Sequence, residues 1–413
     1  MTGNSAYLHK ASYVVPVSGD SNLPAVLNDG AVLTRNGRIV EVGLYKELQG
    51  SDALEVDHGE SVLMPALVNC HSHLELSHLA FLGQRGEYRS GDMTDWISEL
   101  LAEREKSHHP EDMKMAAWQA LARLYAGGCR GVLDIGNLPE SRELAEDFKA
   151  DCRFFREILG LGQPVIEAGL ALLASVEDEP ELFFTAHAPY STAPQLLAKL
   201  KERARRHGHL LPIHVAESAA ESEFLATGEG GFRRFLEERK VWDGTFKPPG
   251  LSPVAYLDSL GVLDELTLCV HCVHCAGGDL EIIARRRSTI CVCPGSNRFL
   301  GVGVAPVPQM FDKEIRVVLG TDSMASNPHL SLWQEMRVLS EDHPDLGAIE
   351  IIRMASRNGA ELMGLAGEIG SLDPGCSSAF LAIRGESIPK GGDDNLLNWL
   401  VTAGLGIITE WVE

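Results

Sequence analysis

The sequence predicts an α/β fold: a TIM-like (β/α)8 barrel with a small β-sandwich domain formed from both chain ends. Between residues 63 and 364, eight short apolar segments alternate with longer helix-like segments, as strands and helices do in such a barrel. The apolar segments are nearly continuous, which is typical of a parallel sheet covered on both faces. Outside this range the chain has strand-and-turn character. We therefore expect residues 1–62 and 365–413 to form the two parts of the sandwich.

The individual elements are predicted from the hydrophobic pattern and the turn residues. Asn36-Gly37 lies between two apolar runs, which is a strong signal for a β-hairpin. The eight expected barrel strands are residues 62–70, 129–136, 152–159, 181–188, 210–217, 266–272, 288–294 and 315–322. Helix-like segments between these strands include residues 192–208, 221–240 and 330–344. Barrels of this class assemble their active sites at the C-terminal ends of the strands.

The composition excludes several classes of protein. The chain has 413 residues, with 36 Lys and Arg against 58 Asp and Glu, and the resulting net charge of −22 disfavours a nucleic-acid partner. No apolar run approaches the roughly 18 residues that a membrane helix needs, and no signal peptide is evident. We expect a cytoplasmic protein that acts on a small molecule, with no membrane or nucleic-acid partner. Barrels of this kind often pair, so a homodimer stays open.

The nine cysteines include a cluster in the second half of the chain. Cys269, Cys272 and Cys275 have the spacing C-x2-C-x2-C, and Cys291 and Cys293 follow, so a zinc or iron–sulfur site is one interpretation. These residues lie in apolar strand-like runs, whereas metal-binding cysteines usually occupy turns with glycine. We therefore favour buried free thiols in a reducing compartment and leave open whether the cluster binds anything.

Four predicted strand ends carry side chains that bind metal ions. His71 and His73 follow the first strand, and because residues two apart in an extended segment point the same way, both imidazoles can reach one ion. The ends of the fifth, sixth and eighth strands offer His214, His271 and Asp322. Each motif alone has an ordinary structural explanation, such as a helix cap for Asp322. Together, at ordered strand ends, they predict one divalent ion that activates a water, with zinc favoured over Fe(II).

Six segments carry a resemblance to the amidohydrolase superfamily: LMPALVNCHSH (63–73), HAPYS (187–191), IHVAES (213–218), HCVH (271–274), CPGSN (293–297) and LGTDSMASN (319–327). Over nearly its whole length the chain is similar to the mononuclear aminohydrolases, a branch of deaminases and triazine hydrolases. The resemblance implies the metal ligands His71, His73, His214 and Asp322. It also implies that Glu217 shuttles protons and that His271 orients the water. The fourth strand offers no lysine for the carboxylated lysine of binuclear members, which favours one metal ion.

A narrower likeness lies around the first strand. Residues 59–77, followed by Gly91-Asp92 and Trp96, resemble the aminodeoxyfutalosine deaminases of menaquinone biosynthesis. The related adenosylhomocysteine and methylthioadenosine deaminases have a ribose-binding Glu two residues before this Trp. Here Thr94 takes that position, and Glu75 is the polar group that could replace it.

The resemblance implies a hydrolytic deamination. The activated water attacks the amino-bearing carbon of a 6-aminopurine nucleoside analogue, while Asp322 and His271 accept or orient its proton. Glu217 protonates the neighbouring ring nitrogen, which relieves the charge that develops on the ring. Ammonia then leaves, and a 6-oxo product remains.

Five residues are expected to contact the substrate: His187, Trp96, Glu75, Arg89 and Arg298. Trp96 covers the base or, equally, anchors its helix in the core. Arg89 and Arg298 are candidates to hold the carboxylate of a futalosine-type substrate, because an acidic protein needs a local cation for that group. Glu157, at the end of the third strand, either contacts the substrate or forms a buried salt bridge.

The same site would serve other reactions of this branch, because the ion activates water in the same way for each. The alternatives are an adenosylhomocysteine/methylthioadenosine, guanine or pterin deaminase, or a triazine-type chlorohydrolase. A barrel that only serves as a scaffold is expected to have lost a ligand or Glu217, and all these positions are intact.

Overall fold

All eight expected strands contribute to parallel sheets in the structure, a computed structural model that describes residues 6–86, 93–106, 109–242 and 244–413. They form two four-stranded sheets, in the orders β6-β7-β8-β9 and β10-β11-β12-β13. The strands are β6 Leu67–Ser72, β7 Cys129–Gly136, β8 Asp151–Ile158, β9 Phe183–Ala186, β10 Leu211–Val215, β11 Thr267–His271, β12 Thr289–Val292 and β13 Val317–Leu319. The predicted α/β class with parallel strands is thereby confirmed.

The two parallel sheets meet along both edges. At one edge β9 is followed by β10, and the backbone N–H of His214 donates to the carbonyl oxygen of His187 over 3.0 Å. At the other edge Ser72, the last residue of β6, pairs with Asp322 in an isolated parallel bridge. The C-terminal ends of the first and last strands are therefore close neighbours, although about 250 residues separate them in the chain.

Gly320 allows the close contact between the end of β6 and the segment that follows β13. A Cβ on Gly320 would lie 2.6 Å from the Cβ of His71 and 2.8 Å from Sγ of Cys291, so only glycine fits between β6 and β12 here. Below this point, apolar side chains from both sheets share one buried cluster, which includes Val68, Leu133, Phe155, Leu268, Val270 and Val318. The two sheets thus share an apolar core beneath their C-terminal ends.

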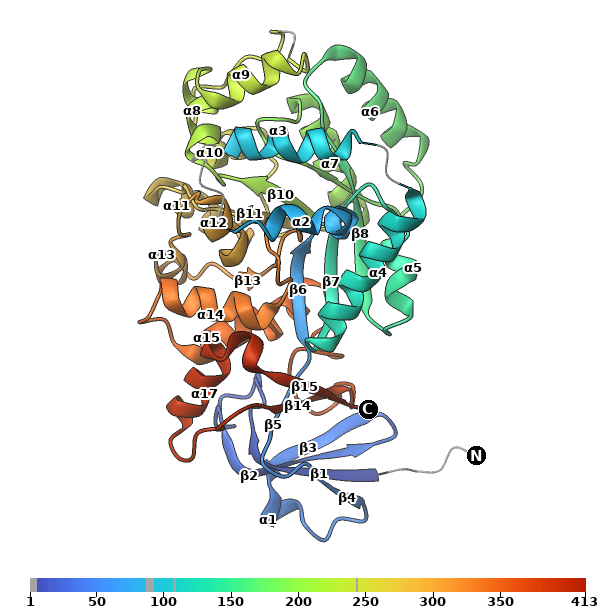
Figure 1. Cartoon of the computed structure of the whole chain (residues 1–413), viewed down its shortest axis with the longest axis vertical. Helices are drawn as coiled ribbons and strands as arrows, with labels where there is room; N and C mark the ends of the chain where they lie inside the picture. The colour runs from blue at the N-terminus through green and yellow to red at the C-terminus, as the bar shows by residue number, and fades with distance from the viewer. Residues whose placement is uncertain (1–5, 87–92, 107–108, 243) are drawn as a thin grey trace.

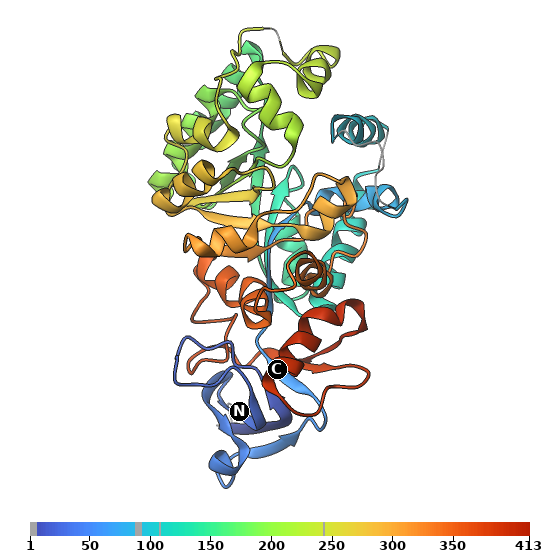
Figure 2. The same cartoon turned by 90° about the vertical axis from the view of Figure 1, so that its left-hand side faces the viewer.

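Helices separate the strands along the chain and lie around the two sheets (Figures 1 and 2). Helix α7 shows why they form: Pro194 occupies its first turn, Leu196, Leu197 and Leu200 face the core, and Gly208 ends it with φ 67°. The helices are α1 Tyr45–Leu48, α2 Ala80–Gly83, α3 Met93–Arg104, α4 Pro110–Ala126, α5 Ser141–Glu146, α6 Gln163–Ser175, α7 Pro194–His207, α8 Ala219–Thr227, α9 Gly231–Glu238, α10 Pro253–Ser259, α11 Gly277–Arg286, α12 Pro294–Leu300, α13 Val307–Asp312, α14 Leu332–Asp342, α15 Ala348–Met354, α16 Arg357–Leu362 and α17 Asp393–Thr402, with the 3-10 helices η1 Leu74–Leu79 and η2 Gly404–Gly406. Within the described ranges, none of the helices combines the length and the apolar character that crossing a bilayer requires.

Strands from both chain ends form a separate mixed sheet at one end of the molecule (Figure 1). Its strands are β1 Ala6–Val14, β2 Leu27–Arg35, β3 Arg38–Leu44, β4 Leu54–Asp57, β5 Val62–Met64, β14 Phe380–Arg384 and β15 Ile408–Val412. The predicted hairpin turn joins β2 to β3, with φ 52° at Asn36 and 77° at Gly37. These strands are hydrogen-bonded into one sheet, because β1 pairs with β4 along its first half and with β5 along its second. The predicted sandwich arrangement stays a prediction.

Three boundaries differ from those predicted. The strand expected at 62–70 is two strands, β5 and β6, because Pro65 has no N–H to donate and interrupts the ladder. The helix expected at 221–240 is split into α8 and α9 around Gly228, which has φ 78°. The C-terminal segment includes the helix α17 as well as strands, and α17 buries Leu396, Leu397 and Leu400.

Candidate metal centre

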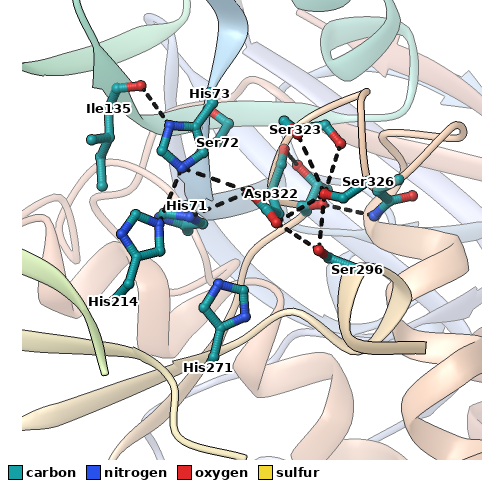
Figure 3. Close-up of polar contacts among 12 residues, drawn as sticks. His71, Ser72, His73, Ile135, His214, His271, Ser296, Asp322, Ser323 and Ser326 are labelled. Atoms are coloured by element: carbon teal, nitrogen blue, oxygen red, sulfur yellow. Dashed lines mark hydrogen bonds and ion pairs between the residues drawn. The ribbon is translucent and has the colours of Figure 1, made fainter. Parts of the chain in front are cut away.

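Side chains from both parallel sheets converge at the C-terminal ends of the strands (Figure 3). The Nε2 atoms of His73 and His214 lie 3.2 Å apart. The Oδ1 atom of Asp322 lies 3.6 Å from Nε2 of His71 and 3.6 Å from Nε2 of His73. The ligand atoms of His71, His73 and Asp322 all lie within 4.8 Å of one another, as one ion would require.

The surroundings of His71 fit a bound ion. The residue is fully buried, and neither ring nitrogen has a hydrogen-bond partner among the described residues. Burying a polar group without a partner is unfavourable by about 1–3 kcal/mol. A divalent ion would supply a partner for Nε2, the nitrogen that faces Asp322, and three imidazoles with one carboxylate suit zinc or Fe(II).

Backbone carbonyl groups orient two of the imidazoles. Nδ1 of His73 lies 3.0 Å from the carbonyl oxygen of Ile135, and Nδ1 of His214 lies 2.8 Å from that of His187. Because a carbonyl only accepts, each ring carries its proton on Nδ1 and keeps Nε2 free for an ion. Burial lowers the pKa of His73 to about 3 and holds the pKa of His214 well below its ordinary value, so both rings are neutral, as ligands must be.

Two hydroxyl groups hold the carboxylate of Asp322. Ser296 Oγ and Ser326 Oγ donate to its Oδ2 over 2.6 and 2.9 Å, which leaves Oδ1 facing the histidines (Figure 3). Burial opposes ionisation of this group, but the imidazoles of His71 and His73 beside Oδ1 outweigh it and hold the pKa of Asp322 well below its ordinary value. The carboxylate is therefore ionised and can hold a cation.

Glu217 and His271 lie beside this cluster. Oε1 of Glu217 is 3.5 Å from Nε2 of His271. Nδ1 of His271 lies 2.9 Å from the amide oxygen of Asn297, which accepts its proton and leaves Nε2 as an acceptor. Burial, reinforced by the charge of Asp322, raises the pKa of Glu217 well above its ordinary value. Glu217 can therefore carry a proton at neutral pH and give it to a substrate.

The backbone at these strand ends is strained. Ala216, His271, Cys272 and Asp322 have φ values of 52°, 74°, 49° and 59°, in the left-handed region that disfavours residues other than glycine. Such conformations concentrate at functional sites, where the surrounding structure holds them. Here they turn the chain sharply at the end of each strand, next to the converging side chains.

The residues that orient the site are not predicted from the sequence, although they lie in its motifs. Asn297 and Ser296 belong to CPGSN, and Ser326 to LGTDSMASN. Glu221 accepts a hydrogen bond from the backbone N–H of Glu217 over 2.9 Å. The only available sequence signal for Glu221 is its position three residues after Ser218, the spacing of a helix capping box.

Two of the expected substrate contacts lie on the β6–β9 side of the cluster. The ligand atoms of Glu157, His187 and His214 lie within 4.8 Å of one another, so His187 is next to a predicted metal ligand. Glu75 is buried, accepts from the backbone N–H of Asn137 over 2.6 Å and pairs with Arg104 over 3.1 Å. Burial, reinforced by the charge of Glu75 and opposed by that of Arg104, raises the pKa of Glu157 to about 8.

The structure does not bring the other expected contacts to the cluster. Trp96 is buried among apolar side chains of η1, α2, α3 and α12, such as Leu79, Leu82 and Phe299, where it anchors α3. Arg298 pairs with Glu341 and Asp342 of α14 over 2.6 and 2.7 Å, because its helix α12 packs against α14. Arg89 lies outside the described residues. The roles assigned to these residues from the sequence stay predictions.

The nine cysteines are free thiols, and only Cys275 is partly accessible. Among the described residues, no cysteine joins a group whose ligand atoms cluster as a metal site requires. The groups that do so consist of histidine, aspartate and glutamate.

Known proteins resemble the chain over most of its length. Residues 62–396 match the model of the amidohydrolase family. A 5-methylthioadenosine/S-adenosylhomocysteine deaminase of Pelotomaculum thermopropionicum is 28% identical over 375 residues, which cover 87% of this chain and 81% of that protein. A 5'-deoxyadenosine deaminase of Methanosarcina mazei is 27% identical over 391 residues, which cover 91% of this chain and 83% of that protein.

Solved structures share the fold. The aminofutalosine deaminase of Helicobacter pylori superposes with a TM-score of 0.79 at 23% identity, over 99% of this chain and 97% of that one. An adenosine deaminase of Xanthomonas campestris with bound zinc superposes with a TM-score of 0.77 at 21% identity, over 97% and 89% of the two chains.

Proposed function

This chain belongs to the amidohydrolase family, and we propose that it is a metal-dependent deaminase of 6-aminopurine nucleosides. The reaction replaces the 6-amino group by an oxo group with one water and releases one ammonia. The observation that carries the proposal is the convergence of His71, His73, His214 and Asp322 beside a buried acid, Glu217. The expectation of a hydrolytic enzyme is met by the family, and the substrate class is supported by curated relatives named as deaminases of adenosine derivatives.

We infer that β6 to β13 close into one (β/α)8 barrel within the predicted range of residues 63–364, of which the first residues, in β5, belong to the mixed sheet. Two contacts support closure at both sheet edges. One is the hydrogen bond between His214 of β10 and His187, which follows β9, and the other is the bridge between Ser72 of β6 and Asp322, which follows β13. The apolar cluster shared by the two sheets supports a common barrel interior. The metal site then lies at the C-terminal face of that barrel, where such enzymes build their sites.

The residues present fit a single divalent ion, for which we propose zinc, with Fe(II) as the alternative. When bound, such an ion lowers the pKa of a water so that the water can attack at neutral pH. Asp322 and the Nε2 atom of His271 accept or orient the proton of that water. Glu217 donates its own proton to the ring nitrogen beside the amino-bearing carbon, so that the ring does not accumulate negative charge as the tetrahedral centre forms.

Two kinds of substrate compete within this class. Aminodeoxyfutalosine, and with it a place in menaquinone biosynthesis, is supported by the residues around β6 that resemble those deaminases. Methylthioadenosine and adenosylhomocysteine are supported by the relatives of 27–28% identity. Guanine, pterin and triazine substrates are the alternatives. They differ from the proposed substrates in the heterocyclic ring, so an assay with different rings distinguishes them.

An assay of ammonia release tests the proposal. Purified protein, loaded with zinc or Fe(II) and analysed for metal, is incubated with adenosine, adenosylhomocysteine, methylthioadenosine, aminodeoxyfutalosine and guanine. We expect about one metal ion per chain and ammonia from the 6-aminopurine nucleosides, most rapidly from aminodeoxyfutalosine. Metal-loaded protein that releases no ammonia from any of these nucleosides, or that is equally active on guanine, contradicts the proposal.

A further inference from the structure

Glu157, which lies near the end of β8, has an unsatisfied carboxylate oxygen next to the predicted metal ligands. Its Oε1 atom is buried and has no hydrogen-bond partner among the described residues. The carboxylate lies within 4.8 Å of ring nitrogens of His187 and His214. A buried acceptor without a donor is costly, so such an atom at an active site indicates that a ligand supplies the donor.

The neighbouring side chains do not satisfy Glu157, because their polar atoms are engaged elsewhere. Nδ1 of His214 is held by the carbonyl of His187, and its Nε2 lies 3.2 Å from that of His73, in the metal cluster. Among the described residues, the cation whose charge acts on Glu157 is Arg104, which is paired with Glu75 over 3.1 Å. Because Glu75 already neutralises Arg104, Glu157 has no described cation to pair with on the β6–β9 side of the cluster.

His187 presents a second acceptor to the same space. Ser191 Oγ donates to the carbonyl of Ala188 over 3.3 Å and lies 2.7 Å from Nδ1 of His187, so it accepts the proton of that nitrogen. The Nε2 atom of His187 is then an acceptor. Two acceptors near each other fit a ligand that brings two donors on adjacent atoms, such as a pair of vicinal hydroxyl groups.

These groups cannot hold a second metal ion with three protein ligands. His214 has one nitrogen on a carbonyl and the other in the cluster with His71 and His73, so it has none to offer Glu157 and His187. Only Glu157 and His187 would remain, which is fewer than the three protein ligands of a typical catalytic zinc site. A hydroxyl-bearing ligand is therefore favoured over an ion.

We propose that Glu157 is a specificity-determining residue that accepts a hydrogen bond from a sugar hydroxyl of the substrate and so selects ribonucleosides over deoxyribonucleosides and free bases. The inference rests on the proposed function and deepens it. The purine ring must lie between Glu217 and the ion, on the side of β10 to β13. Glu157 and His187 lie across the cluster on β8 and after β9, where the sugar of such a substrate would extend.

The test crosses two variants with three substrates. Glu157→Ala removes the acceptor, and Glu157→Gln keeps an acceptor oxygen at nearly the same volume. Each is assayed with the best nucleoside substrate and with its 2′-deoxy and 3′-deoxy analogues. The control is Glu167→Ala, which removes an exposed carboxylate from the next helix, α6.

We expect Glu157→Ala to lower kcat/KM for the ribonucleoside about 10-fold, as for the loss of a hydrogen bond between neutral groups, mainly through KM. For the analogue that lacks the contacted hydroxyl, the loss should fall below about threefold, because wild type has already lost that bond. Glu157→Gln should retain most of the activity, and metal content should be unchanged in all variants. An equal loss on all three substrates, or a loss of metal with Glu157→Ala, overturns the proposal.

A binding measurement separates this proposal from the proposed function. If wild type releases no ammonia from any nucleoside, the deaminase assignment fails by itself. Calorimetric titration of metal-loaded Glu217→Gln protein with the ribonucleoside and the deoxynucleosides, with and without Glu157→Ala, still decides the role of Glu157. We expect about tenfold weaker binding of the ribonucleoside only. Equal affinity for the ribonucleoside with and without Glu157 contradicts the inference.

Discussion

The two sides of the metal cluster differ in how completely the protein satisfies their polar groups. On the acid side, which we define as His214, Glu217, His271 and Asp322 at the ends of β10 to β13, partners fix the key atoms. On the open side, which we define as Glu157 and His187, an acceptor oxygen has no described partner. The difference indicates that the acid side is preorganised for chemistry, whereas the open side awaits the hydrogen bonds of a ligand.

Each side is therefore expected to respond differently to substitution. Variants of the acid side should change metal content or kcat, because they remove groups that act on the reacting atoms. Variants of the open side should change KM with metal content unaltered. Four substitutions test this contrast, and they are given in order of decreasing effect.

Asp322→Ala should have the largest effect. The variant loses the only carboxylate of the ligand set and leaves Ser296 and Ser326 without their acceptor, so we expect loss of the metal ion and of detectable turnover. Metal analysis by mass spectrometry, together with the ammonia assay, measures both. A variant that retains a full complement of metal removes Asp322 from the ligand set.

Glu217→Gln should separate acid catalysis from metal binding. The amide cannot give a proton to the ring, so we expect kcat to fall about 10²- to 10⁴-fold while metal content stays at the wild-type value. Glu238→Gln, at an exposed position on α9, is the matched control and should behave as wild type. Near wild-type turnover by Glu217→Gln would show that another group supplies the proton.

Ser296→Ala should weaken metal binding less severely. Ser326 still donates to the same oxygen of Asp322, so we expect a loss at the lower end of the roughly 10- to 100-fold range known for partners of metal ligands. Competition with a chelator measures the affinity, and Ser175→Ala, at the exposed end of α6, is the control. An unchanged affinity would mean that Ser326 alone orients the carboxylate.

Arg298→Ala should have the smallest effect. Its guanidinium pairs with Glu341 and Asp342 at a partly exposed position, so we expect less than about 1 kcal/mol of lost stability and a change in KM below about twofold. Thermal denaturation and steady-state kinetics measure the two. A large rise in KM confined to substrates with a carboxylate would show that Arg298 holds that carboxylate, as the sequence predicts.

The predicted metal ligands and His271 are largely predictable from the sequence, because short motifs encode them. His71 and His73 are two residues apart at a strand end, which directs both rings to one region without knowledge of the rest of the fold. His214, His271 and Asp322 each lie at or near the C-terminal end of a predicted strand, and parallel strands of one sheet end together. The strand assignment therefore suffices to place these residues near one another.

The expected substrate contacts are less predictable, because the type of a residue does not reveal which partner its side chain contacts in the folded protein. Glu75 and Arg104 are 29 residues apart and pair with each other. Trp96 is suited to stacking on a base, yet its ring lies in an apolar cluster. Arg298 follows a motif of the site and still points to the acids of α14. Each outcome depends on helix packing over long sequence distances.

Local sequence patterns encode the α/β class, the eight strand segments and the residue types that gather at their C-terminal ends, because alternation of apolar and polar residues acts locally. The folded chain is needed to see which carbonyls and hydroxyls orient the imidazoles and Asp322, and which carboxylate stays unpaired. Those choices depend on hydrogen bonds between distant segments, such as Ser296 to Asp322 and Asn297 to His271, whose geometry no local pattern encodes.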